Sequence, residues 1–269
     1  MTHLFSLAHL SALDLTPPEL IMVAAEGGYD YVGLRLVAVT PGGAAWDLKN
    51  DKRMRTLTKA AIIQTGVGVL DVELARLEPH TDVRAFLDCL EGGAEIGARH
   101  VLTQADDEDV QRLTDNFAAL CDLAAPFGLT CDLEFIPWLR TRDLLGAATL
   151  LRAADRDNGG LMIDSLHFAR AECSLDHLDE MPRSWFHYVQ LCDATKAAPP
   201  TLQGLLYAAR EERLFPGDGE LDIVGLMRKL PKDIPIALEI PTETRAFTAP
   251  PEERAKLARE ATLRVLAQL

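Results

Sequence analysis

The sequence is poor in positive charge for its length. Its 27 lysines and arginines stand against 41 aspartates and glutamates, which gives 269 residues a formal net charge of −14. Nucleic-acid binding depends on a basic surface that neutralises phosphates, so this balance excludes nucleic acid as an expected partner. The balance still allows a small anionic substrate that is bound by a few local arginines.

Paired cysteines and long apolar runs are also missing. The five cysteines are odd in number and form no C-x-x-C pair, which favours reduced thiols over disulfides. No apolar run approaches membrane-spanning length, and the amino terminus lacks the basic and apolar regions of a signal peptide. We therefore expect a cytoplasmic protein with no membrane partner, whose 48% hydrophobic and 25% charged residues are those of an ordinary globule.

The sequence does contain a repeated pattern of short apolar runs and helices that end in glycine. Thr16-Pro17-Pro18-Glu19 has the spacing of a capping box and predicts the start of the first helix. A later helix is expected from Thr141 to Gly160. Glycines at intervals of 31 to 38 residues are predicted to close five helices: Gly28, Gly66, Gly97, Gly128 and Gly160.

The alternation of strands and helices predicts the fold. Eight strands are expected, at residues 5–9, 31–36, 67–73, 100–103, 131–134, 161–164, 185–191 and 235–239. With right-handed crossovers and no linker, this pattern predicts one α/β domain over 1–269, a (β/α)₈ TIM barrel. An open doubly wound sheet is the alternative, but no G-x-G-x-x-G follows the first strand.

Four of the later strands end in a side chain that carries oxygen. These residues are Glu134, Asp164, Gln190 and Glu239. Active sites of such barrels lie at the carboxyl ends of the strands, so the four should converge there. Converging carboxylates repel one another unless a cation lies between them. All-oxygen ligands favour Mn²⁺ or Mg²⁺, with Co²⁺ or Zn²⁺ as alternatives.

These residues belong to an ordered set of motifs that runs through most of the chain. The set resembles the xylose isomerase-like barrel superfamily, in its sugar phosphate isomerase/epimerase branch. It consists of Glu134, the Asp164-x-x-His167 pair, the strand that ends Val189-Gln190-Leu191-Cys192-Asp193, the Arg213-x-x-Pro216-Gly217-x-Gly219 turn and Glu239. The resemblance implies that Glu134, Asp164, Gln190 and Glu239 bind the metal. It also implies that His167 and Arg213 contact substrate.

The resemblance implies an isomerase or epimerase of carbohydrate metabolism. Glu134 and Glu239 would lie on opposite sides of a small polyhydroxylated ketone and move a proton next to its carbonyl. Gln190 departs from the histidine usual in the epimerases and resembles the 3-dehydroshikimate dehydratases. The first alternative is therefore a lyase that dehydrates a cyclic hydroxyketone, such as 3-dehydroshikimate or a keto-cyclitol, with His167 protonating the leaving group. The second alternative is a barrel that binds a sugar without turnover.

Further residues are candidates for contact with a sugar, sugar phosphate or cyclic hydroxyketone. Arg35 is either an anion clamp or an ion-pair partner, and together with Arg213 it predicts a negatively charged substrate. His9 is a candidate for the pocket wall, and Trp138 for an apolar wall over a sugar ring. Asp193 is expected to cap the loop that follows it. The other histidines are expected to be structural, and a homo-oligomer remains open.

Overall fold

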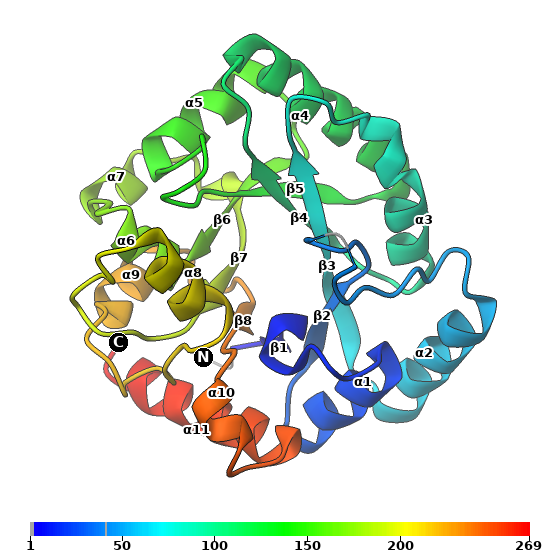
Figure 1. Ribbon diagram of the computed structural model, residues 1–269, viewed down its shortest axis with the longest axis vertical. Coiled ribbons are helices and arrows are strands. Elements are labelled where there is room, and N and C mark those ends of the chain that lie inside the picture. Colours follow the sequence, from blue (N-terminus) through cyan, green and yellow to red (C-terminus); the bar gives the residue numbers. More distant parts are fainter. Residues whose placement is uncertain (1–2, 41) are drawn as a thin grey trace.

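The strands form a closed barrel in the order of the sequence, as expected (Figure 1). A computed structural model describes residues 3–40 and 42–269. Each strand pairs in parallel with its neighbours, and β1 closes the barrel against β8. The strands are β1 Phe5–Leu7, β2 Tyr31–Arg35, β3 Gly68–Leu77, β4 His100–Ala105, β5 Thr130–Glu134, β6 Gly159–Asp164, β7 Phe186–Leu191 and β8 Ile236–Leu238.

Helices surround the barrel and cover its outer face (Figure 1). The α-helices are α1 Pro17–Glu26, α2 Lys52–Thr65, α3 Leu87–Glu95, α4 Val110–Ala124, α5 Leu144–Ala154, α6 Ser165–Arg170, α7 Asp176–Asp179, α8 Leu202–Arg210, α9 Ile223–Lys229, α10 Glu243–Ala246 and α11 Pro251–Leu266. Short 3₁₀ helices are η1 His9–Ala12, η2 Val83–Phe86, η3 Ala125–Phe127 and η4 Arg183–Trp185. In the part of the chain described, no helix has both the length and the apolar character needed to cross a bilayer.

Local signals placed most helix ends correctly, with one exception. The capping box at Thr16 and Glu19 forms as predicted, with the Thr16 amide donating to Glu19 at 2.8 Å. Gly160, however, does not close a helix, because α5 ends at Ala154 and Asp155 takes the left-handed conformation. Gly160 lies in β6, where an added Cβ would come within 2.5 Å of Asp132 Oδ1. Its role is therefore close packing inside the barrel.

Strand bounds differ from the expected ones at both ends of the barrel. The first strand stops at Leu7, and His9 opens η1 instead of extending the strand. β3 runs four residues beyond the expected end at Glu73, to Leu77, and its register shifts against both neighbouring strands. Such bulges redirect side chains. The longer β3 carries Arg76 to the carboxyl-terminal end of the barrel, where it lines the cavity described below.

The core has two parts, as a barrel requires. Most buried apolar residues lie in one large cluster. A smaller cluster consists of residues of five strands that pack on one another: Leu70, Leu74, Leu102, Met162, Tyr188 and Ala237. Burial of apolar area at roughly 25 cal/mol per Å² makes such layers the main stabilising term of the barrel.

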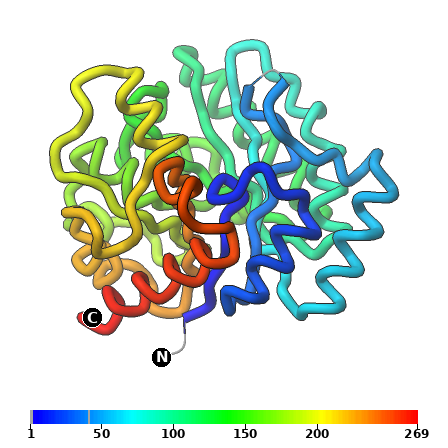
Figure 2. Tube along the Cα trace, turned by 60° about the horizontal axis from the view of Figure 1, so that its bottom comes forward, coloured from blue at the N-terminus to red at the C-terminus, as the bar shows by residue number. Residues whose placement is uncertain are grey.

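The long connection 194–222 between β7 and α9 is held by one carboxylate. Asp193 accepts hydrogen bonds from the backbone amides of Ala194, Gly217, Gly219 and Leu221, at 2.8 to 3.1 Å. This confirms the structural role expected for Asp193. In Figure 2 the blue start of β1 lies at one end of the barrel, and the yellow part of this connection rises at the other.

Candidate active site

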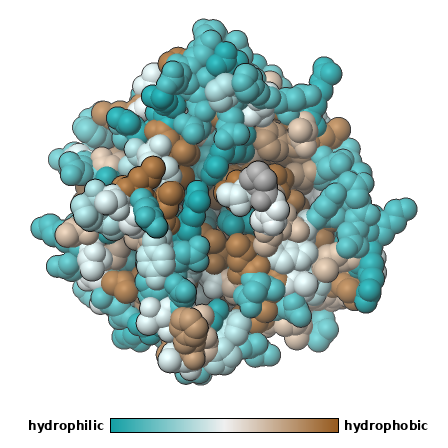
Figure 3. Space-filling view, viewed as in Figure 1, coloured by the Kyte–Doolittle hydropathy of each residue, from teal (hydrophilic) through white to brown (hydrophobic). Residues whose placement is uncertain are grey.

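The four predicted oxygen ligands all lie at the carboxyl ends of their strands. Glu134 and Asp164 are the last residues of β5 and β6, Gln190 is next to last in β7, and Glu239 directly follows β8. Each is no more than 4% exposed. A cavity of about 480 Å³ opens here, lined among others by Glu134, Glu239, His167 and Arg213. Figure 3 views this face, where hydrophilic side chains gather around the centre.

Asp164 is fixed in place by the helix that follows it. As the N-cap of α6, its Oδ1 accepts hydrogen bonds from the amides of Leu166 and His167, at 2.7 and 3.1 Å. This explains the spacing of the Asp164-x-x-His167 pair, because one turn of helix returns His167 to the same site. Asp164 Oδ2 remains available and accepts from Arg213.

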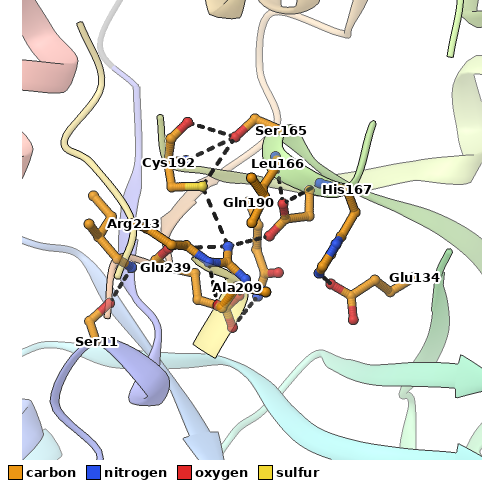
Figure 4. Close-up of polar contacts among 12 residues, drawn as sticks. Ser11, Glu134, Ser165, Leu166, His167, Gln190, Cys192, Ala209, Arg213 and Glu239 are labelled. Atoms are coloured by element: carbon orange, nitrogen blue, oxygen red, sulfur yellow. Dashed lines mark hydrogen bonds and ion pairs between the residues drawn. The ribbon is translucent and has the colours of Figure 1, made fainter. Parts of the chain in front are cut away.

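Arg213 lies between two of the predicted ligands (Figure 4). Its Nη1 is 2.7 Å from Asp164 Oδ2, and its Nη2 is 2.8 Å from Glu239 Oε2. Burial would raise the pKa of Asp164, but the combined effects of Arg213 and His167, through charge and hydrogen bonds, outweigh burial and lower it. Burial raises the pKa of Glu239 to about 7. The charge of Arg213 opposes this increase, while the charges of Asp164 and Glu73 add to it.

Glu134 lies beside His167, and both line the cavity (Figure 4). His167 Nε2 is 3.7 Å from Glu134 Oε1, while Gln104 Nε2 donates to Glu134 Oε2 at 2.6 Å. Burial, and next the charges of Glu239 and Asp164, raise the pKa of Glu134 well above its usual value. Burial lowers the pKa of His167 to about 4, so its imidazole is neutral at pH 7.

The donor set fits a divalent cation. Two of the three buried carboxylates, Asp164 and Glu239, pair with one buried guanidinium, that of Arg213. Glu134 pairs with no arginine among the described residues, which leaves an excess of negative charge in a dry site. Gln190 Oε1 is buried, with no hydrogen-bond partner among the described residues, while its Nε2 donates to Glu239 at 3.5 Å. Such an unpartnered oxygen is costly unless an unseen group pairs with it. The arrangement suits a cation that takes oxygen ligands.

One group of potential ligands at this site differs from the predicted four. Glu134, Asp164 and His167 each offer one ligand atom, and these atoms lie within 4.8 Å of one another. Glu239 and Gln190 are not in this group. Arg213 bridges Glu239 to Asp164, and this bridge separates the two carboxylates.

Of the residues predicted to contact substrate besides Arg213, Arg35 and Trp138 line the cavity and His9 does not. Arg35 lines the cavity but is ion-paired with Glu73, at 3.0 Å. Trp138 lines the cavity and meets the His167 ring edge-on, with centroids 5.3 Å apart. His9 is fully buried, stacks on Trp46 at 4.3 Å, and is not among the described residues that line the cavity. Both of its ring nitrogens bond to backbone, at Arg35 and Leu15.

The cavity residues that sequence reasoning did not single out include Gln104, Arg76 and Arg210. Gln104 has the same signal as Gln190, since it is next to last in its strand, β4. Arg76 lies on the part of β3 beyond its expected end. Arg210 ends α8 in the long connection, where no periodic signal marks a residue that faces the cavity.

A second polar cluster lies near the start of the strands. Asp132 is fully buried and accepts from His187 Nδ1 at 2.6 Å and from Thr130, with His100 Nδ1 at 3.4 Å from its other oxygen. The His100 and His187 rings stack at 5.5 Å. Every polar atom named here has a partner inside the cluster, which agrees with the structural role expected for both histidines.

Known proteins resemble the chain over most of its length. A protein family described as "Xylose isomerase-like TIM barrel" matches residues 21–265. A 3-dehydroshikimate dehydratase of Pseudomonas aeruginosa is 31% identical over 116 residues, which are 43% of this chain and 18% of that protein. An inosose isomerase of Bacillus licheniformis is 27% identical over 154 residues, or 55% of this chain and 53% of that protein.

The chain thus spans about half or less of the length of these curated relatives. Among solved structures, the IOLI protein with a bound zinc atom superimposes with a TM-score of 0.77. It is 19% identical, and the match covers 98% of both chains. This likeness confirms the barrel fold.

Proposed function

Since the chain belongs to the xylose isomerase-like TIM barrel family, we propose that it is a divalent-metal-dependent isomerase or epimerase of a small polyhydroxylated ketone. Relatives named as inosose isomerases and 3-dehydroshikimate dehydratases support an enzyme that acts on a hydroxylated ring ketone. The cavity of about 480 Å³ has room for one such ring.

The observation that carries the proposal is the excess of buried carboxylates around the unpartnered Gln190 Oε1. Glu134, Asp164, Gln190 and Glu239 would hold the ion. A bound divalent ion would act as a Lewis acid on the carbonyl oxygen of the substrate. Mn²⁺ or Mg²⁺ suits the oxygen ligands, while the presence of His167 beside them and the zinc atom of the IOLI structure support Zn²⁺ or Co²⁺ as alternatives.

Glu134 and Glu239 are the proposed acid–base pair. They follow β5 and β8, three strands apart around an eight-stranded barrel, so a substrate in the cavity would lie between them. One carboxylate would remove the proton from the carbon next to the carbonyl, and the other, protonated, would return a proton to the opposite face. In the metal-free chain, burial raises the pKa of both groups. Trp138 would cover the apolar face of the ring.

Dehydration is the second candidate reaction, and two observations favour it. Gln190 takes the place of the histidine usual in the epimerases, and the dehydratase relatives reach 30 to 31% identity. The first step would again be proton removal by a glutamate. His167, 3.7 Å from Glu134, would then lie near a leaving hydroxyl group.

Proton NMR in D₂O tests both reactions and the non-catalytic alternative. Purified protein with Mg²⁺ or Mn²⁺ is incubated with a panel of ketoses, inososes and 3-dehydroshikimate. Loss of the α-proton signal supports isomerisation, and new vinyl signals support dehydration. Glu134→Gln and Glu239→Gln should each abolish the exchange, whereas the exposed Glu252→Gln should retain it. A metal-loaded protein that binds these ketones without exchange would instead be a sugar-binding barrel.

A further inference from the structure

The two arginines expected to bind an anionic substrate are already paired with carboxylates. Arg35 bonds to Glu73 at 3.0 Å, and Arg213 bonds to both Asp164 and Glu239. A guanidinium with its donors directed at a protein carboxylate has little charge left for a second anion. Neither residue is therefore the best candidate for binding an anionic group of the substrate.

Arg76 and Arg210 line the same cavity without a carboxylate partner within the described part of the chain, as does Arg254, which donates to the Ala249 carbonyl. Arg76 directs Nε and Nη2 at Gln104 Oε1, a neutral acceptor, at 3.1 and 2.6 Å. Arg210 forms neither a hydrogen bond nor an ion pair through its side chain with any residue at 3–40 or 42–269. Both side chains are half-buried and line the cavity. A half-buried guanidinium without a carboxylate partner is unusual in a chain of net charge −14.

These two arginines line the same cavity, and the charge of Arg76 acts on Arg210. The pKa of Arg210 is lowered, first by burial and then by the positive charges of Arg76 and Arg35. Like charges held together in a partly desolvated site repel, and an anion bound between them would relieve that repulsion. Two planar guanidinium groups are also the donors that best fit carboxylate and phosphate oxygens.

The pair also adjoins the proposed catalytic groups. Gln104 accepts from Arg76 and donates to Glu134, so it connects the two through hydrogen bonds of 2.6 Å. The charge of Arg210 acts on His167. In Figure 1, α8, which ends at Arg210, lies over the end of the barrel beside β7 and β8. An anionic group held here would leave the rest of a small substrate directed at Glu134.

We propose that Arg76 and Arg210 form an anion-binding subsite that takes a carboxylate or phosphate group of the substrate. This inference rests on the proposed function, because it assumes that the cavity binds a small polyhydroxylated ketone. It narrows the substrate class to acidic sugars, sugar phosphates or carboxylated cyclic ketones.

Anion binding in the absence of turnover tests the subsite. Inorganic phosphate, acetate and neutral erythritol are titrated by calorimetry into the full chain, both as purified and after EDTA treatment. We expect phosphate or acetate to bind in both preparations, and erythritol to bind more weakly. Arg76→Gln and Arg210→Gln should each weaken anion binding by about tenfold or more, which is the size expected for one lost charge-assisted contact.

Arg254→Gln is the matched control, because Arg254 lines the same cavity and donates only to the Ala249 carbonyl in the described chain. Arg76→Lys and Arg210→Lys, which keep the charge, should retain part of the affinity and guard against misfolding. Unchanged affinity in both glutamine variants, or an equal loss in Arg254→Gln, would overturn the subsite. Affinity that disappears with EDTA would assign the anion to a metal and also overturn it.

The outcome is independent of the proposed reaction. A chain that binds anions through Arg76 and Arg210 but exchanges no α-proton would retain the subsite and refute the proposed function. A chain that turns over ketones, but whose anion affinity is the same with and without Arg76 and Arg210, would support the proposed function and refute the subsite. Phosphate binding without acetate binding would point to sugar phosphates, and acetate binding without phosphate binding to carboxylated rings.

Discussion

Arg213 holds Asp164 and Glu239 on one guanidinium group, through Nη1 at 2.7 Å and Nη2 at 2.8 Å. These are two of the four residues proposed to hold a metal ion. Arg213 is only 2% exposed, so in the metal-free chain it supplies the charge that keeps both carboxylates buried. The protein cation and a metal ion would therefore partly replace one another.

Removal of Arg213 should consequently destabilise the metal-free chain far more than the metal-loaded one. In EDTA, Arg213→Met should lower the free energy of unfolding by about 3–5 kcal/mol, the usual loss when a buried pair is broken. Saturating Mg²⁺ or Mn²⁺ should reduce this loss. Urea denaturation with and without the ion measures both values, and Arg254→Met serves as control. Equal losses in both conditions would show that the ion and Arg213 do not share ligands.

Gln190 should contribute to metal affinity through Oε1. Gln190→Ala is expected to weaken binding of the ion by about tenfold or more, because the loss of even an indirect partner has that effect. The rise of melting temperature on metal addition should shrink accordingly, since a ligand of the native state stabilises it in proportion to its affinity. The exposed Gln64→Ala is the control. Unchanged affinity in Gln190→Ala would remove Gln190 from the ligand set.

Glu239 should make the metal-free protein less stable as pH rises. Its pKa is raised from 4.5 to about 7, so the native state favours the protonated form. The protonated Glu239 contributes its full share of the free energy of unfolding below 4.5, the pKa of this group in the unfolded chain. That contribution is lost as pH rises toward and through about 7.

Glu239→Gln cannot ionise and should lack this dependence. Relative to wild type, its free energy of unfolding should increase between acid and neutral pH, by on the order of 3 kcal/mol. Chemical denaturation in EDTA at a series of pH values measures the difference, with Glu252→Gln as an exposed control. A constant difference across this range would contradict a raised pKa at Glu239.

His187 and Asp132 should show the coupling of a buried ion pair below neutral pH. Burial would lower the pKa of His187, but the hydrogen bond to Asp132, the charge of Asp132 and a hydrogen bond to the Ser184 backbone together outweigh burial and raise the pKa above 6.5. The ion pair therefore contributes to the free energy of unfolding below pH 6.5. This contribution is lost as pH rises through the raised pKa of His187 in the folded chain.

A double-mutant cycle of His187→Gln and Asp132→Asn measures this contribution directly. The coupling free energy should be larger at about pH 5.5 than at about pH 8.5, because only the protonated imidazole forms an ion pair. The exposed His80→Gln controls for loss of a titrating histidine. A coupling energy that stays constant or grows with pH would contradict the assignment.

The sequence by itself determined the barrel and the positions of its acids. The capping box at Thr16 and the helix-closing Gly66 are signals within a few residues of the chain, and both form in the structure as the sequence predicts. Because all strands of a parallel barrel end at the same face, a carboxylate at the end of three strands was enough to bring Glu134, Asp164 and Glu239 to the same end of the barrel.

Only the tertiary structure decided how these side chains are paired. Arg213 is 49 residues from Asp164 and 26 from Glu239, and no local pattern encodes a contact across such separations. The same holds for Arg76, which reaches the cavity because bulges lengthen β3, and for Gly160, whose neighbours come from β5 and β7. Periodicity determines which face of an element a residue occupies. The choice of partner for each charged side chain depends on distances of a few ångströms between separate elements. Packing alone sets those distances.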